Sequence, residues 1–537
     1  MKKFACVTLS AFMMLTSIAG LAACNKDNSE GNVVVTYIQG DRDKPDFELV
    51  QKTVSDYCQE KLGFGVTFKP TAVWDQDVLY TKWLSGGEDI DVINLAFTDQ
   101  MQYIKEKRIR EIDSLLMEEN APNLIDLLDQ YTSSRLVGVD GKLYGIGTIE
   151  PIEGTTGGSI IIKKDVMEKC GLLGTEGEYK YEDYEKVDYA DLDYIFNAIK
   201  SNPETNKTAS GATVYPCPVL PATDPCMAFA PCDPMSNDTV VAVLPRNADG
   251  TFGDKVVNYY EMDSYKQFVE KMGEWQAAGY IHKDATTTPD SYDTLLKNGQ
   301  FVSMFLSISA GLRNSYENDY DAEFIELLLC DPYYTFNGVP QMSLSINSKS
   351  KRPDKAMKFI DLLYSDEYLI NLIQYGIEDK HWYRLTDDEE TRKYIAIVPE
   401  NDEQQLYAKV PGVYGNKAMI YAMISGEGNV EEVITKAIEA ETKDYEFADI
   451  AKVNASPAAG FRYDRTEMNN RLRSINSNAI ARYKATLACG KGKKGSDGTW
   501  TGPGSAYADF IAALKSNKVE LVVQDKQSQY DAWLTSK

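Results

Sequence analysis

The stretch Val33-Val34-Val35-Thr36-Tyr37-Ile38, followed by Gln39-Gly40-Asp41, decides how this chain folds. Its β-branched and aromatic residues are typical of a buried strand, and the glycine behind them predicts a loop. Farther along, a helix is expected from Phe47 to Leu62, a strand from Gly65 to Phe68 and a third strand from Ile90 to Leu95. Strands that alternate with helices predict a parallel sheet, so we expect an α/β fold.

Ligands of open α/β sheets bind beyond the carboxyl ends of the strands. Gln39 and Asp41 follow the first predicted strand, and Phe97 and Asp99 follow the third. Trp74 lies in a polar loop, where a role in the core is harder to argue than contact with a ligand. These five side chains are therefore candidates for a binding site.

The first 24 residues have the order of a secretory signal. Lys2 and Lys3 precede the mostly apolar run from Val7 to Ala22, and Leu21-Ala22-Ala23-Cys24 closes it. This ending resembles the lipobox of bacterial lipoproteins, which implies that residues 1–23 are removed and that Cys24 is lipidated. Residues 24–32 then form a polar tether, and the body is expected outside the cytoplasm, anchored to the cell membrane through lipid alone.

Composition limits the function further. A formal net charge of −25 disfavours nucleic acid as a partner, because a phosphate-backbone binder needs a basic surface. No segment after the signal approaches the roughly 20 apolar residues of a spanning helix. Among the cysteines, Cys217, Cys226 and Cys232 lie close together, and the sequence leaves open whether they form a disulfide or, less plausibly, a metal site.

Catalytic motifs are scarce. The chain has only His282 and His381, and neither HExxH nor GxSxG occurs, which disfavours zinc peptidases and serine hydrolases. The Gly-rich run from Gly490 to Gly495 imitates a phosphate-binding loop, but Ser496 stands where lysine is needed. A glycosidase needs only two carboxylates, so a secreted glycan-active hydrolase stays open as an alternative.

Several segments together resemble one family. They are the lipobox, Glu88-Asp89-Ile90-Asp91-Val92-Ile93, Gly141-Lys142-Leu143-Tyr144-Gly145-Ile146, Leu296 to Met304 and Ser345 to Leu363. In this order they resemble the family-1 extracellular solute-binding proteins of bacterial carbohydrate ABC importers. Val257 to Glu261 and Tyr375 to Tyr383 are similar to a long lipoprotein subgroup of the LipO type.

The resemblance implies a two-lobed, type II periplasmic-binding-protein-like fold, in which each lobe is a sheet flanked by helices. Lobe 1 is expected to hold residues 33–148 and about 331–376, and lobe 2 residues 149–330 and about 377–537. Hinge crossovers are expected near Thr148 to Pro151, Cys330 to Tyr334 and Tyr375 to Asp379. Periodicity alone predicts a core helix from Pro353 to Ile373 and places Trp275 at the packed edge of another helix.

The function implied is capture of a carbohydrate, expected to be an oligosaccharide, between the lobes and delivery to the transmembrane subunits of an ABC permease. We expect no enzyme activity, no cofactor, no metal and a monomer; a surface glycan sensor or adhesion module is a further alternative. Glu150 matches a loop that holds a sugar-hydroxyl acceptor in the family, whereas the stretch from Ser307 to Leu312 lacks the family's usual cleft aromatic. The full set of predicted ligand-binding residues is Gln39, Asp41, Trp74, Phe97, Asp99, Glu150, Ser307, Arg313, Glu378 and Trp382.

Overall fold

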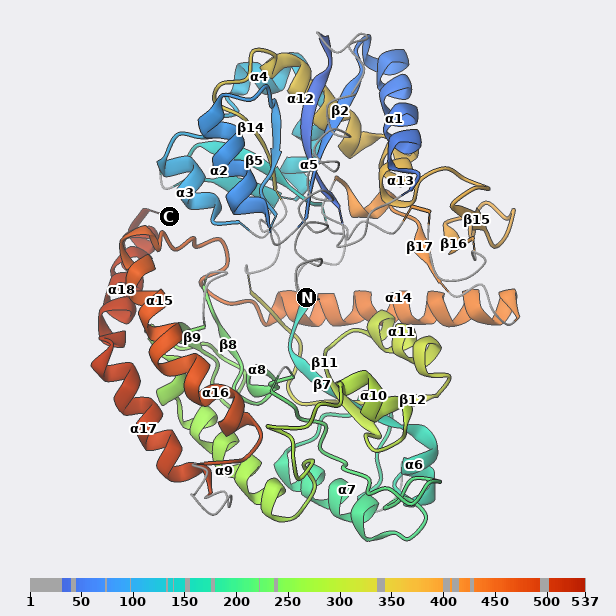
Figure 1. Ribbon diagram of the computed structural model, residues 1–537, viewed down its shortest axis with the longest axis vertical. Coiled ribbons are helices and arrows are strands. Elements are labelled where there is room, and N and C mark those ends of the chain that lie inside the picture. Colours follow the sequence, from blue (N-terminus) through green and yellow to red (C-terminus); the bar gives the residue numbers. More distant parts are fainter. Residues whose placement is uncertain are drawn as a thin grey trace, which may run out of the picture.

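The computed structural model shows two lobes, one above the other in Figure 1, with the helix α14 (Val430–Val453) lying between them. We call the upper one lobe 1 and the lower one lobe 2. The structure describes residues 31–39, 45–72, 75–96, 98–131, 134–138, 140–149, 155–174, 179–221, 223–235, 240–335, 343–398, 406–407, 415–424, 429–492 and 502–536. The predicted signal, Cys24 and most of the tether lie outside these residues.

Lobe 1 is built on a six-stranded sheet with the order β2-β1-β3-β14-β5-β4. β1 pairs in parallel with β2 along its whole length and with β3, which confirms the parallel arrangement predicted from the sequence. β14 and β5 join antiparallel to their neighbours. The strands are β1 (Val33–Gln39), β2 (Val66–Ala72), β3 (Val92–Asn94), β4 (Arg135–Val137), β5 (Leu143–Gly147) and β14 (Ser343–Ile346).

Helices cover this sheet, and the predicted core helix is among them. It divides into α12 (Pro353–Ser365) and α13 (Glu367–Tyr375), because the Asp366 carboxylate accepts a hydrogen bond from the Leu369 backbone N–H at 2.8 Å and starts a new helix. Phe359 and Ile360 are buried as periodicity predicts. The other helices of lobe 1 are α1 (Phe47–Leu62), α2 (Gln76–Gly86), α3 (Gln100–Lys105), α4 (Ser114–Asn120) and α5 (Pro122–Gln130).

Lobe 2 has a smaller sheet with the order β11-β7-β12, and all three strands are antiparallel neighbours. Its helix α9 (Asp263–Ala277) carries Trp275, which is 1% exposed and packed as predicted, with its indole N–H bonded to Asp193. The main elements of this lobe are β7 (Gly158–Lys163), β11 (Ser303–Ser307), β12 (Phe324–Leu328), α6 (Lys164–Lys169), α7 (Tyr189–Ser201), α10 (Tyr292–Lys297) and α11 (Ala310–Tyr320).

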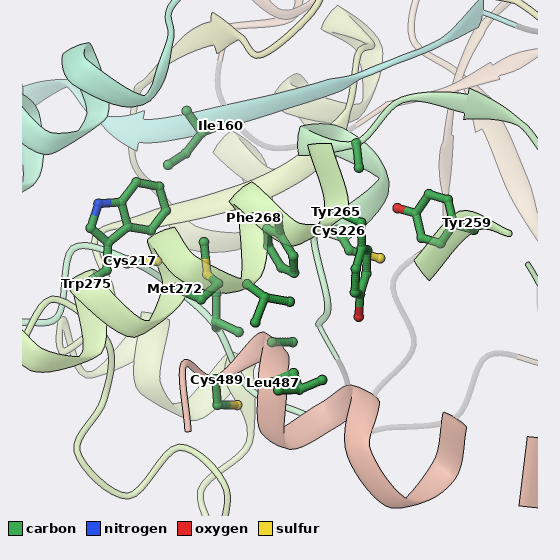
Figure 2. Close-up of a cluster of buried hydrophobic side chains, with 14 of the residues drawn as sticks. Ile160, Cys217, Cys226, Tyr259, Tyr265, Phe268, Met272, Trp275, Leu487 and Cys489 are labelled. Carbon is green, nitrogen blue, oxygen red and sulfur yellow. The ribbon is translucent and has the colours of Figure 1, made fainter. Parts of the chain in front are cut away.

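The end of the chain completes the core of lobe 2. Figure 2 shows Leu487 and Cys489 facing Met272 and Phe268 of α9. Gly490 has φ +68°, and a Cβ there would lie 2.1 Å from the Met272 carbonyl oxygen, so this glycine serves close packing. The C-terminal helices are α15 (Asn469–Ile475), α16 (Ala481–Ala488), α17 (Pro503–Ser516) and α18 (Val519–Ser536).

The chain passes between the lobes three times. The first two passages, after β5 and before β14, run side by side, since β6 (Thr155–Thr156) pairs with β13 (Tyr333–Tyr334). The third passage lies between β17 (Ala422–Met423) and α14, not at Tyr375 to Asp379.

The segment before that third passage differs from the expected lobe division. Ile377, Tyr407 and Ile420 pack against the core of lobe 1, whereas a boundary near residue 376 would assign them to lobe 2. The reason is that α13 shares an apolar cluster with the small sheet of β15 (Trp382–Arg384), β16 (Tyr394–Ile397) and β17.

The described residues contain neither a helix that could span a membrane nor a disulfide. None of their helices combines the length and the apolar character that crossing a membrane requires. All seven cysteines from Cys58 onward lie in described segments and are free, so Cys217, Cys226 and Cys232 form no disulfide in this structure.

Candidate functional site

The parallel strands β1 and β3 of lobe 1 are held by a buried polar network. The Thr36 hydroxyl accepts hydrogen bonds from the Asn94 backbone N–H at 2.7 Å and from the Tyr80 hydroxyl at 3.0 Å. Tyr80 also donates to the Asn94 carbonyl at 2.9 Å. These bonds fix the middle of β1 and the carboxyl end of β3 against α2.

Most of the predicted ligand-binding residues belong to the loops that follow the strands of lobe 1. Asp41, Trp74, Phe97 and Glu150 lie outside the described residues. Gln39 ends β1, opposite Ala72 of β2, so its backbone stands at the expected edge of the sheet. The structure therefore places the strand ends that carry these residues, and their roles stay predictions.

Asp99 lies at this edge and already has two partners. It caps α3, since its Oδ1 accepts a hydrogen bond from the Gln102 backbone N–H at 3.4 Å. Its Oδ2 accepts one from Arg465 Nε at 3.0 Å. Arg465 belongs to the chain that leads into α15, so Asp99 joins lobe 1 to lobe 2. No signal in the sequence could have revealed this contact, because Arg465 lies 366 residues from Asp99.

The two predicted residues of lobe 2 differ in their surroundings. Ser307 ends β11 and is exposed. Arg313, in contrast, is only 15% exposed, bonds Asp183 and lies over the ring of Tyr184, 4.8 Å from its centroid. Its guanidinium holds α11 to the rest of lobe 2, which leaves Ser307 as the member of this pair that is open to a ligand.

Glu378 and Trp382 are engaged within lobe 1. Glu378 Oε1 accepts a hydrogen bond from Arg384 Nε at 2.7 Å. Trp382 is 3% exposed, and its indole N–H donates to the Gly376 carbonyl at 3.0 Å. Its ring packs against Tyr421, so in this structure it is part of a hydrophobic cluster.

A charged group near the start of α1 was not singled out from the sequence. Asp46 Oδ2 lies 2.9 Å from Lys380 Nζ and 3.1 Å from His381 Nε2. The Lys380 ammonium, together with His381, lowers the pKa of Asp46 despite the opposing effect of burial. His381 Nδ1 accepts the Ile377 backbone N–H at 2.8 Å, so the ring is held as a structural link.

A second contact between the lobes lies near β16 and β17, on the side of Figure 1 opposite α3. Lys393 of lobe 1 reaches both carboxylate oxygens of Glu441 in α14, at 2.9 and 2.7 Å, and the Tyr394 hydroxyl donates to the same carboxylate at 3.2 Å. α14 itself packs on α11 and β13. The described lobes are therefore joined by at least two side-chain contacts, one at Asp99 and one at Glu441.

Within the described residues, no group of three or more His, Cys, Asp or Glu side chains is arranged to hold a metal ion. The residues predicted for ligand contact are an amide, carboxylates, aromatic residues, one serine and one arginine. This combination of side chains suits a polar ring-shaped ligand, which offers hydroxyls to planar polar groups and apolar faces to aromatic rings.

Comparisons with known proteins agree with this geometry. No protein-family model matches the chain. A carbohydrate ABC transporter substrate-binding protein of Streptococcus pneumoniae serotype 4 is 24% identical over 554 residues, which span 100% of this chain and 99% of that protein.

Solved structures are similar over almost the whole chain. The N-glycan transport solute binding protein NgtS of Streptococcus pneumoniae gives a TM-score of 0.68 at 18% identity, over 94% of this chain and 99% of that one. The substrate binding protein FusA of S. pneumoniae, in complex with kestose, gives 0.59 at 17% identity, over 94% and 100%. An HMO-binding solute binding protein of Bifidobacterium longum infantis gives 0.62 at 15% identity, over 94% and 99%. The chain thus has the type II periplasmic-binding-protein-like fold expected from its sequence.

Proposed function

We propose that this chain, an extracellular solute-binding protein of the carbohydrate ABC transporter type, captures an oligosaccharide between its two lobes and delivers it to a membrane permease. The observation that carries the proposal is the arrangement of lobe 1: the carboxyl ends of three parallel strands face a second lobe across three chain crossings. A ligand bound there touches both lobes and favours their closure.

The size of the ligand is inferred from similar proteins. NgtS has been crystallised with Man5GlcNAc and FusA with kestose, and the similarity to both covers nearly the full chain. We therefore expect an oligosaccharide and not a monosaccharide.

The residues we propose for ligand contact are the exposed Ser307, the residue that ends β1, and those in the loops outside the described residues. They are Gln39, Asp41, Trp74, Phe97 and Glu150 in lobe 1 and Ser307 in lobe 2. Asp99, Arg313, Glu378 and Trp382 are engaged within the protein, and for them we propose a supporting role.

The partners follow from the same proposal. A lipid on Cys24 would hold the protein at the outer face of the cell membrane, and residues 25–32 would give it reach. The ABC permease subunits would receive the loaded protein as a monomer.

The raised pKa of Glu326 gives no support to the hydrolase alternative. Burial raises the pKa of Glu326 to about 7, which is the range of a glycosidase general acid. However, Glu326 is fully buried in lobe 2 and accepts its hydrogen bond from Ser159 at 2.6 Å. A sugar cannot reach it, so this carboxyl is no candidate acid.

Thermal denaturation of the purified mature chain tests the function. The panel should contain fructo-oligosaccharides, mannose-containing N-glycan fragments and human milk oligosaccharides, with glucose and an unrelated polyol as controls. A rise in melting temperature with one oligosaccharide class, recovered intact by mass spectrometry, is the expected result. Shorter products would refute the binding-protein proposal in favour of a hydrolase.

A further inference from the structure

The segment from Phe461 to Met468, which we call the clasp, lies between α14 and α15 and touches both lobes. Three of its side chains contact lobe 1. Arg462 Nη2 donates to the Arg135 carbonyl at 3.0 Å, Arg465 Nε donates to Asp99 Oδ2 at 3.0 Å, and Glu467 pairs with Lys105 at 3.1 Å.

The intervening residues hold the clasp to lobe 2. Phe461 packs in the lobe 2 core against Tyr530 and Trp533 of α18. The Tyr463 hydroxyl donates to Asp525 at 2.8 Å. Gln529 accepts from the Asp464 backbone N–H and donates to the Asp464 carbonyl, both at 2.9 Å. The clasp therefore moves with α18 and lobe 2.

The three contacts differ in their distance from a chain crossing. Arg135 pairs with Ile146 in β4 and β5, just before the chain leaves lobe 1, so the Arg462 contact lies beside a hinge. Asp99 and Lys105 lie at the two ends of α3, which Figure 1 shows at the outer edge of lobe 1. Displacement in a hinge rotation grows with distance from the axis, so we expect opening of the lobes to separate Arg465 from Asp99 more than Arg462 from Arg135.

The two outer ion pairs, Arg465–Asp99 and Lys105–Glu467, differ in their exposure to solvent. Asp99 is 17% and Arg465 32% exposed, whereas Lys105 and Glu467 are 45% and 80% exposed. An exposed pair contributes little because water and salt screen it. Of the two outer pairs, Arg465–Asp99 is thus the one that contributes more to holding the lobes together.

We propose that Arg465 and Asp99 form a closure-dependent latch that sets how much of the free protein is closed. This goes beyond ligand contact, because it assigns Asp99 to the joining of the lobes. A test that measures ligand affinity rests on the proposed function. In such a test, the apparent dissociation constant rises as the closed fraction of the protein falls.

The first test needs no ligand. Small-angle X-ray scattering of the free protein should give a larger radius of gyration for Arg465→Ala and Asp99→Asn than for the wild type. Asparagine still caps α3, so the second substitution removes only the charge. Arg473→Ala, an exposed arginine of α15, is the matched control and should scatter as the wild type does.

The second test is a double-mutant cycle on affinity for any oligosaccharide that the panel identifies. Each single substitution should weaken binding about three- to ten-fold, and the double variant no more than either one, as expected for one shared ion pair. Lys105→Ala should change affinity by less than about two-fold.

The two proposals fail in different ways. If no sugar binds, the scattering still tests the latch. If Arg465→Ala and Asp99→Asn scatter as the wild type does, the latch is refuted, whatever the protein binds. Additive losses of affinity in the cycle would likewise refute it, because they would show that Asp99 and Arg465 act separately.

Discussion

The two lobes build their cores by different routes. The core of lobe 1 joins β-strands with the helices that follow them closely in the chain, and α12 and α13 complete it. The core of lobe 2 joins β7 to α9 and then to residues near the chain end, such as Phe510 and Tyr530. Lobe 1 therefore consists mostly of local units, while lobe 2 depends on its last 70 or so residues for a closed core.

Buried charges also differ between the lobes. In lobe 1, Asp91 is buried and bonded by Arg352 from the β14–α12 connection, with Nη2 to Oδ2 at 2.8 Å. In lobe 2, Lys526 is 1% exposed and donates to the carbonyls of Pro234 and Ala242, both at 2.9 Å, and Glu326 keeps one carboxylate oxygen without a hydrogen bond in the described structure. Lobe 2 therefore contains buried polar groups that are costly to desolvate. One of them, Lys526, is supplied by the last helix, so the complete chain is needed to form its hydrogen bonds.

The largest expected effect on stability comes from removing a large buried side chain that the end of the chain contributes to the lobe 2 core. Phe510 is fully buried and packs against Tyr260. Phe510→Ala should lower the free energy of unfolding of lobe 2 by about 3–5 kcal/mol. In calorimetry only the lobe 2 transition should move. The matched substitution Phe359→Ala in lobe 1 should lower the melting temperature of the lobe 1 transition alone. A shift of both transitions by either substitution would contradict independent cores.

A smaller and pH-dependent effect is expected at Glu326. Burial raises the pKa of this carboxyl to about 7, against the opposing effects of Ser159 and Arg313. Between about pH 4.3, where the unfolded carboxyl ionises, and pH 7, the folded form holds a proton that the unfolded form has lost, so stability falls as pH rises. At pH 8 the ionised group costs up to about 3 kcal/mol.

Glu326→Gln should remove that pH dependence. In urea titrations, the variant is expected to gain on the wild type steadily from pH 5 to pH 8. A constant difference across this range would mean that Glu326 is already ionised at pH 5 in the folded protein, so that its pKa is not raised.

The smallest expected effect lies in lobe 1, at Asp46. Lys380 and His381 lower the pKa of this carboxyl, so its contribution is present at neutral pH and is lost as the pH falls through the range below about 4. Because the side chain is 20% exposed, Asp46→Asn should cost only about 1 kcal/mol at pH 7. Urea titrations at pH 7 and pH 3.5 should show this difference shrinking; an undiminished difference would indicate a steric cause.

Local patterns predicted much of the fold. The β-branched run at Val33, the helix from Phe47 and the packed Trp275 all follow from periodicity, and the structure confirms them. The lobe boundary could not be located from periodicity. Ile377 and Tyr407 lie beyond the boundary expected near residue 376, yet they join lobe 1 through contacts that have no periodic signal. The long helix α18 was also missed, since its apolar residues are spaced irregularly between polar ones.

The candidate site was less accessible to sequence. Residue type and position after a strand pointed to Asp99, but its partner Arg465 lies 366 residues away, and no local pattern links the two. Trp382 and Arg313 have side chains suited to sugars, yet their neighbours engage them within the protein. The chemical type of each candidate side chain could be predicted from the sequence, whereas its availability to a ligand depends on the tertiary structure.

Backbone amide hydrogen exchange, with and without a saturating oligosaccharide from the panel, tests the central claim most directly. A ligand held between the lobes should protect amides at both borders of the site, in lobe 1 around Gln39 and Asp99 and in lobe 2 around Ser307. Protection confined to one lobe, with the other unchanged, would contradict capture between the lobes.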